Sequence, residues 1–268
     1  MRADLVTWTR LVRAGFRRQS AYRLAMVAGL CTNVVFGFIR AAILFAALDS
    51  AGGSIAGYDQ GSVGAYVWLS QGLLGAIQLN GAADVGDRVR TGDVAVDLTR
   101  PVDLQTWHLA EDLGRSAYTV LPRLLPSVAV GALTVGLAMP ATAWPYVLGA
   151  ASIVLGVTLS FYCRFAVNVL GFWLLDTRGL RTLYMVVSTF LAGLYVPVAL
   201  FPDWLRTLAH TTPFPSILQV PIDIVSGRLG PTDAAKAFAV QCFWVAVACL
   251  AGRLLMAAGR RKLVVQGG

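Results

Sequence analysis

Residues 24–48 read LAMVAGLCTNVVFGFIRAAILFAAL, an apolar run long enough to cross a lipid bilayer as a helix. Runs of similar character recur along the whole chain, and no segment between them is long enough to fold as a separate domain. The sequence therefore predicts an all-α, polytopic membrane protein forming one transmembrane domain over residues 1–268. Its six transmembrane helices are expected at 24–48, 61–79, 116–139, 146–175, 182–201 and 234–256.

The composition agrees with a protein dissolved in lipid. Hydrophobic residues make up 57% of the chain and charged residues 13%, whereas a soluble domain typically has about 25% charged residues. The basic residues also divide unevenly between the connections. Sixteen Lys and Arg fall in 1–23, 81–116, 176–181 and the stretch after 252, against three on the opposite side. This bias predicts that both termini are cytoplasmic.

Three segments outside the apolar runs have patterns of their own. Residues 1–20 place Leu5, Trp8, Val12 and Phe16 at helical spacing, which predicts an amphipathic helix lying in the membrane interface. Residues 81–116 are the longest polar stretch and are expected to form the main cytoplasmic loop. Residues 202–233 are rich in proline, and we expect two short re-entrant helices there on the outer side.

Several classes of function are excluded by what the sequence lacks. The two lysines, Lys236 and Lys262, follow Ala235 and Arg261, so no Gly-Lys-Ser/Thr loop for ATP exists. Both histidines fall in loops, and no Asp or Glu lies inside a predicted span. The four cysteines lie in apolar runs, which favours buried thiols over a disulfide or a zinc site. We therefore expect no catalytic residue, no metal ligand and no enzyme activity in this chain.

A few polar residues lie within the predicted spans and are candidates for a translocation path. Most such groups hydrogen-bond between helices, and contact with a substrate is the alternative. For Arg40 the two alternatives are an outward, snorkelling side chain and one that faces an interior path or a partner subunit. Arg164 is expected to snorkel to the cytoplasmic surface. The candidates for the path are Asn33, Arg40, Gln71, Ser188 and Thr189.

Residues 82–90 are predicted to form a short amphipathic helix that Gly92 ends, while Pro101 stiffens the return to the third span. A surface of this kind suits docking of a partner, and a solvated loop that contacts nothing is the alternative.

Two stretches carry a resemblance to a known family. Residues 90–103, RTGDVAVDLTRPVD, are similar to the Gly-Asp…Leu-x-Arg-Pro cytoplasmic loop of a subgroup of bacterial permeases. Residues 201–206, FPDWLR, with PFP at 213–215, are similar to the outer re-entrant helices of the same family. With the six spans and the amphipathic lead-in, the chain resembles an ABC-2 type transporter permease over essentially its whole length.

The resemblance implies a function and partners. It implies a permease subunit of an ATP-driven exporter in the bacterial inner membrane that moves an amphipathic substrate such as a drug, natural product, lipid or lipid-linked glycan. ATP and Mg would be bound by partner ATPase subunits, in two copies, with no cofactor in this chain. The second permease would be a different homologous chain or a second copy, with lipids around both and no nucleic acid bound.

The resemblance also assigns roles to residues. An outer gate is expected at Trp204, Pro213, Phe214 and Pro215. The ATPase-coupling residues are expected to be Asp84, Asp87, Arg88, Arg90, Asp93, Asp97, Arg100 and Pro101.

Two other classes of function are alternatives. A secondary transporter generally needs a site for a coupling ion, often with intramembrane carboxylates, and the predicted spans contain none. A non-transporting membrane scaffold subunit is the second alternative, and only the partners of the chain distinguish it from an exporter.

Overall fold

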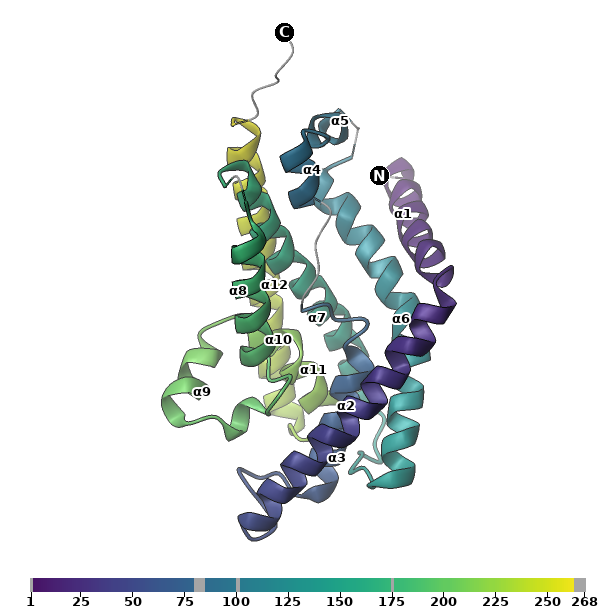
Figure 1. Cartoon of the computed structure of the whole chain (residues 1–268), viewed down its shortest axis with the longest axis vertical. Helices are drawn as coiled ribbons and strands as arrows, with labels where there is room; N and C mark the ends of the chain where they lie inside the picture. Colours follow the sequence, from purple (N-terminus) through teal and green to yellow (C-terminus); the bar gives the residue numbers. More distant parts are fainter. Residues whose placement is uncertain (1, 80–84, 100–101, 175, 263–268) are drawn as a thin grey trace.

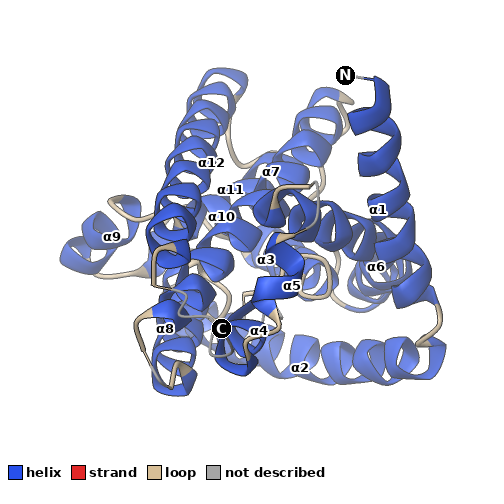
Figure 2. Cartoon of the chain, turned by 90° about the horizontal axis from the view of Figure 1, so that it is seen from above, coloured by secondary structure: helices blue, strands red, loops and turns tan. Residues whose placement is uncertain are grey.

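The computed structural model describes residues 2–79, 85–99, 102–174 and 176–262, and almost every regular element in them is helical (Figures 1 and 2). α1 begins and α12 ends at the same end of the bundle, here called the terminal end (Figure 1). The elements are α1 (Arg2–Ser20), α2 (Arg23–Ser50), α3 (Gln60–Leu73), α4 (Val85–Thr91), α5 (Val94–Leu98), α6 (Leu104–Thr134), α7 (Trp144–Val169), η1 (Leu170–Phe172), α8 (Arg178–Leu191), η2 (Val198–Leu200), α9 (Asp203–His210), α10 (Phe214–Ile217), α11 (Gln219–Val225) and α12 (Pro231–Arg260).

Four helices in the described part of the chain are long and apolar enough to cross a membrane: Arg23–Ser50, Leu104–Thr134, Trp144–Phe172 and Pro231–Arg260. They correspond to four of the six predicted spans. Between 17% and 39% of the most apolar window of each helix is buried inside the chain. Large apolar side chains such as Leu24, Ile43 and Leu133 remain exposed, as expected of helices whose outer faces contact lipid.

The other two predicted spans contain shorter helices. α3 and α8 have 14 residues each, or about 21 Å at 1.5 Å per residue, less than the roughly 30 Å of hydrocarbon in a bilayer. α8 ends because Gly193 adopts φ +82°, which lets the N–H of Leu194 reach the carbonyl of Thr189 at 3.2 Å.

α3 lies at the centre of the bundle (Figure 2) and forms the middle of the core. Every residue from Val63 to Leu73 is buried, and Tyr66 and Trp68 are fully covered. The helix begins with a capping box in which the Asp59 side chain accepts from the N–H of Ser62 at 2.8 Å. This burial arises because α2, α6 and α11 pack around α3.

The expected loop at 81–116 is shorter than predicted. α6 begins at Leu104, twelve residues before the expected third span, because Asp103 caps it by accepting from the N–H of Thr106 at 2.9 Å. The first part of the loop forms α4 and α5, and Gly92 separates them with φ +83°. This confirms Gly92 as the end of the first short helix.

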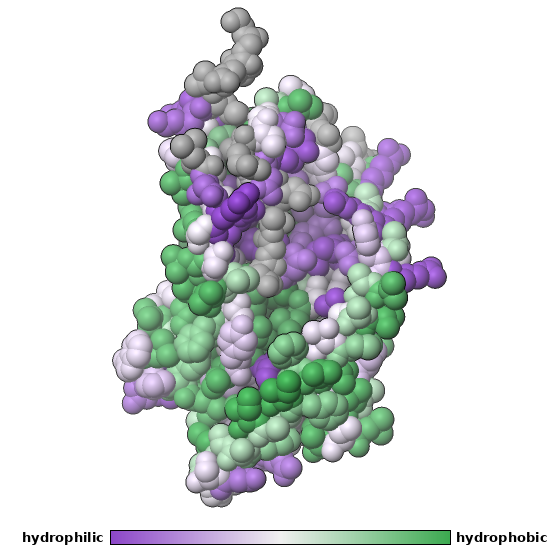
Figure 3. All heavy atoms as spheres, in the orientation of Figure 1, coloured by the Kyte–Doolittle hydropathy of each residue, from purple (hydrophilic) through white to green (hydrophobic). Residues whose placement is uncertain are grey.

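α1 covers Arg2–Ser20 and packs against α6. Hydrophilic residues gather near the terminal end on the face in Figure 3, while apolar residues cover most of the lower half. A helix is therefore present where it was expected. Two residues of its predicted apolar stripe are exposed, Leu5 at 65% and Phe16 at 41%, and its position in a membrane interface stays a prediction.

Candidate functional site

α4 and α5 carry the charged residues predicted to couple the chain to a partner. Arg88 forms a two-point ion pair with Asp97, through Nε and through Nη2, which lies 2.9 Å from Oδ1. The Asp97 side chain is 4% exposed. This pair therefore holds α4 against α5, and its carboxylate is not open to a partner in this conformation.

The other coupling residues differ in how they are placed. Asp87 is half-exposed and its carboxylate lies 3.6 Å from Arg181 of α8. Asp93 is exposed and accepts from the Thr91 hydroxyl at 2.8 Å. The remaining predicted positions lie outside the described residues, or have side chains that do: Asp84, Arg90, Arg100 and Pro101.

The two short helices rest on the bundle through an apolar contact. Val94 of α5 is fully buried in a cluster with Leu104, Phe165, Val169 and Met256, from α6, α7 and α12. On another face of the same helix, Val96 is 61% exposed. α5 thus presents an apolar side chain to the surroundings while Val94 fixes it to three long helices.

The chain after α3 leaves the regular helical pattern, and side chains of other helices donate hydrogen bonds to its carbonyl oxygens. Arg115 of α6 donates to the carbonyls of Gly75 at 2.8 Å and Ala76 at 3.1 Å. Ser116 adds a bond to Ala76 at 2.9 Å. The carbonyls of Gln78 and Leu79 accept from Ser160 of α7 and Ser188 of α8. Irregular backbone is tolerated at membrane depth only where protein covers it in this way.

The predicted path residues fall into two groups. Asn33 of α2 donates to the Gln71 carbonyl of α3 at 2.9 Å, and Arg40 donates to the Ser70 hydroxyl at 2.9 Å. These three path residues therefore meet at the α2–α3 contact. The Arg40 side chain points into the chain, and its Nε and Nη2 have no hydrogen-bond partner among the described residues.

Ser188 and Thr189 form the second group, on α8. Ser188 is buried and donates to the Leu79 carbonyl at 3.3 Å. Thr189 is 6% exposed, and its backbone oxygen receives the bond that ends the helix. Both groups of residues make the interhelical or capping bonds that polar residues in spans usually make, and a role in translocation stays a prediction.

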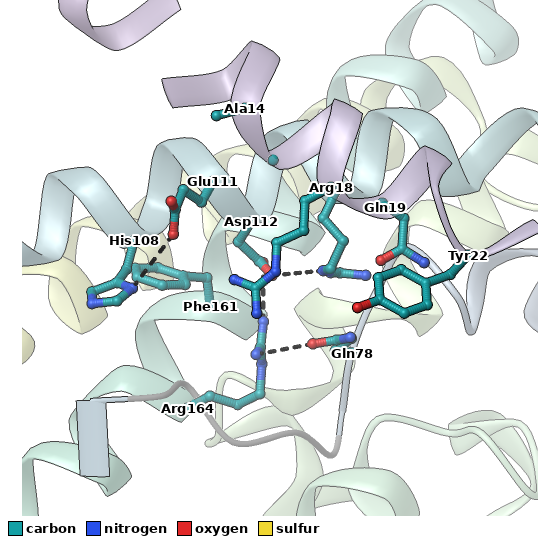
Figure 4. A pocket seen from close by; sticks show the side chains of 12 residues that line it. Ala14, Arg18, Gln19, Tyr22, Gln78, His108, Glu111, Asp112, Phe161 and Arg164 are labelled. Atoms are coloured by element: carbon teal, nitrogen blue, oxygen red, sulfur yellow. Dashed lines mark hydrogen bonds and ion pairs between the residues drawn. The ribbon is translucent and has the colours of Figure 1, made fainter. Parts of the chain in front are cut away.

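A cavity of about 540 Å³ lies near the terminal end of the bundle, between α1, α6, α7 and Gln78 (Figure 4). On its wall, Asp112 of α6 pairs with both Arg115 at 3.0 Å and Arg164 of α7 at 3.0 Å. Arg164 also donates to the Gln78 side chain at 3.2 Å. The expectation that Arg164 snorkels is wrong, because the carboxylate of Asp112 holds its side chain inside the bundle at 3% exposure.

The proline-rich segment forms three short helices, α9, α10 and α11, where two were expected. Trp204 on α9 is 69% exposed and Leu208 is 48% exposed. Pro213 precedes α10, Pro215 is buried in it, and the ring of Phe214 lies 6.1 Å from that of Tyr184 on α8. The predicted gate residues therefore divide into an exposed aromatic on α9 and an inner group that packs on α8.

A buried polar cluster connects this segment to the start of α3. Gln219 donates to Asp223 at 2.8 Å and to the Tyr58 hydroxyl at 3.2 Å, and its Oε1 accepts from the N–H of Val198 at 3.0 Å. Arg228 lies 3.4 Å from Asp223 and covers the Tyr58 ring. Burial raises the pKa of Asp223 to about 6, although the bond from Gln219 and the charge of Arg228 oppose the shift.

An all-helical chain with four membrane-length apolar helices, a covered central helix and polar groups bonded between helices is a polytopic membrane protein. The sequence model of the ABC-2 family transporter proteins matches residues 35–267, and the chain belongs to that family. Members of the family are membrane transport components rather than catalysts. Comparison with curated proteins finds no match.

Two features of the site were missed from the sequence. The Arg115–Asp112–Arg164 cluster joins residues about fifty positions apart. Its one signal in the sequence was Arg164, an arginine within a predicted span with no acidic residue near it in the sequence. The early start of α6 had a local signal, since Asp103 with Thr106 is a helix-capping pattern.

Proposed function

We propose that this chain is the membrane-spanning permease subunit of an ATP-driven exporter. The observation that carries the proposal is the family match over residues 35–267. It is supported by a sequence that contains no P-loop, because a transporter of this family without a nucleotide site must receive work from another chain. The direction of transport, out of the cytoplasm, is proposed from the resemblance of residues 90–103 and 201–215 to the family's motifs.

The proposed topology has six crossings with both termini in the cytoplasm. α3 and α8 would each complete a crossing with the chain that follows it. For α3 this chain is 74–79, whose backbone oxygens are covered by α6, α7 and α8. The terminal end, with its many arginines, would then face the cytoplasm of a bacterial cell.

Coupling would use the surface of α4 and α5. Asp93 and Val96 are exposed there, whereas Val94 and the Arg88–Asp97 pair fix the two helices to the bundle. A force on this surface therefore reaches α6, α7 and α12 through packed side chains. The partner would be an ABC ATPase with bound ATP and Mg, in two copies.

The substrate class would be amphipathic: a drug, natural product, lipid or lipid-linked glycan. In the described parts of the four long helices the lipid-facing side chains are mostly apolar, and a wall of that kind suits such a molecule better than a small ion. The path would run between this chain and a second permease, either a different homologous chain or a second copy.

The first experiment tests the partnership. The full chain, with an affinity tag and expressed together with its neighbouring genes, is purified in mild detergent, and the co-purifying proteins are identified by mass spectrometry. An ATPase subunit in stoichiometric amount is the expected result. A chain that reproducibly purifies without an ATPase overturns the exporter proposal and favours a scaffold or a secondary transporter.

The second experiment tests the coupling surface in that complex. Val96→Glu and Asp93→Arg are expected to reduce substrate-stimulated ATP hydrolysis at least tenfold without changing expression, because both side chains are exposed. Asp49→Arg is the matched control, since it reverses an exposed acid at the end of α2, away from α4 and α5. Equal ATPase activity in all four proteins would place the coupling surface elsewhere.

A further inference from the structure

Among the described residues, the cavity near the terminal end has more positive than negative charge on its lining. Arg115 and Arg164 share one carboxylate, that of Asp112. Their side chains are 17% and 3% exposed, and that of Asp112 is 10% exposed. Two guanidinium groups facing one carboxylate leave an excess positive charge, and an uncompensated buried charge is costly.

The hydrogen bonds of Arg164 also show that it has too few acceptors. Nη2 is bonded to Asp112 and Nη1 to the neutral side chain of Gln78. Nε is buried and has no hydrogen-bond partner in the described part of the chain. A largely buried arginine that lines a cavity and retains an unused donor is a group that an anionic ligand can satisfy.

Other residues around the cavity add a third cation and aromatic surface. Arg18 extends from α1 toward the same space (Figure 4) and has no ion-pair partner among the described residues. Phe161 and Tyr22 contribute aromatic surface. Glu111 also lines the cavity, 4.0 Å from His108. Apart from His108, three arginines and two carboxylates line the cavity, which leaves one net positive charge among these groups.

We propose that this cavity binds a phosphate group, held by Arg18 and Arg164 with Arg115 behind them. Arginine donors match the geometry of phosphate oxygens better than lysine does. The volume of about 540 Å³ lies within the range of small-ligand sites and far exceeds that of one water molecule. The phosphate belongs either to the headgroup of an amphiphile or to a soluble phosphate compound, and the two sources are separated experimentally. The inference does not rest on the proposed coupling to an ATPase.

The experiment measures the thermal unfolding midpoint of the full chain purified in neutral detergent. The probes are dioctanoyl phosphatidic acid, dioctanoylglycerol with the same chains and no phosphate, and inorganic phosphate. Phosphatidic acid is expected to raise the midpoint by about 5 °C near saturation, and dioctanoylglycerol is expected to have no comparable effect. A rise with inorganic phosphate at the same concentrations identifies a soluble compound as the ligand, whereas a rise with phosphatidic acid alone identifies a headgroup.

Variants link the effect to the cavity. Arg164→Gln leaves Asp112 paired with Arg115, and Arg18→Gln changes only an exposed residue on α1, so both proteins are expected to fold. Each should weaken phosphatidic acid binding at least tenfold, whereas Arg13→Gln, an exposed arginine of α1 that does not line the cavity, should not. Wild-type binding by both cavity variants, or an equal response to dioctanoylglycerol, would overturn the proposal.

Discussion

Gly15 of α1 lies directly against the backbone of Glu111 in α6: a Cβ atom at Gly15 would be 2.1 Å from the Glu111 carbonyl oxygen. The relationship is repeated one turn away, where a Cβ atom at Gly114 would be 1.9 Å from the carbonyl oxygen of Val12. Two glycines thus allow the two helices to touch backbone to backbone. α1 is therefore held to α6 by the close fit of the two backbones.

Replacing Gly15 by alanine should detach or displace α1. Glycine to alanine in an exposed helix normally stabilises by up to about 1 kcal/mol, but here the methyl group overlaps backbone and should cost about 1–3 kcal/mol. The measurements are the thermal midpoint and hydrogen exchange of the α1 amides. Gly179→Ala on α8 is the control, because nothing lies within 4 Å of its added carbon. An equal upward shift in both variants would contradict the close contact.

Removing the hydroxyl groups that bond to the chain after α3 should destabilise the fold. Ser160→Ala leaves the covered Gln78 carbonyl without its side-chain donor, at a cost of about 1–3 kcal/mol. Ser116→Ala removes one of the two side chains that donate to the Ala76 carbonyl, at a cost of about 1 kcal/mol. Thr158→Ala on α7 removes only an exposed bond within its own helix. Thermal midpoints should therefore fall clearly for the first two variants and little for Thr158→Ala. The same small change in all three would mean that these bonds contribute little.

Arg40→Met should stabilise the isolated chain. Arg40 has one hydrogen bond to Ser70 and no ion-pair partner in the described part of the chain, and placing a charge there is costly. The thermal midpoint of the chain in detergent should rise by a few degrees. If Arg40 also lines the path, the assembled complex should lose transport while gaining stability. Arg40→Lys, which keeps the charge, should show neither the gain in stability nor the full loss of transport.

Asp223 should make stability depend on pH. Its pKa is raised to about 6 by burial, so the folded protein holds the proton more tightly than the unfolded chain does. That contribution to stability is fully present below about pH 4 and is lost as the pH rises through about 6. The loss is on the order of 3 kcal/mol.

Asp223→Asn is neutral throughout this range and should not show the loss. The thermal midpoint of the variant relative to wild type should rise between pH 4 and 7 and then stay constant. The change with pH is the quantity to measure, because the lost ion pair with Arg228 adds an offset. Parallel pH profiles for the two proteins would show that the carboxyl group of Asp223 has its ordinary pKa.

Much of the fold could be predicted because its signals are local. Apolar length predicts the four long helices, the spacing of Trp8 and Val12 predicts α1, and Gly92 predicts the end of α4. The short helices between residues 203 and 225 follow from prolines that stop longer ones. Each of these features depends on residues within one or two helical turns.

The site was harder to predict because its bonds join distant parts of the chain. Arg164 considered alone is a long side chain that can reach the surface, and only the position of Asp112, 52 residues earlier, retains it. The end of α3 at Leu73 likewise depends on Arg115, about 40 residues later. The guanidinium of Arg115 donates a hydrogen bond to a carbonyl oxygen just beyond the helix. Sequence patterns within one segment cannot show such pairs.

The stretch 74–79 also limits how the helices can move. Side chains from α6, α7 and α8 all bond to its carbonyl oxygens. A slide of any of these helices by one turn, about 5.4 Å, would break every bond that the helix contributes. Rearrangement of the three helices therefore has discrete steps, and small tilts that preserve the bonds are the motions with low cost. Residues 74–79 therefore form one shared contact that α6, α7 and α8 keep while they tilt.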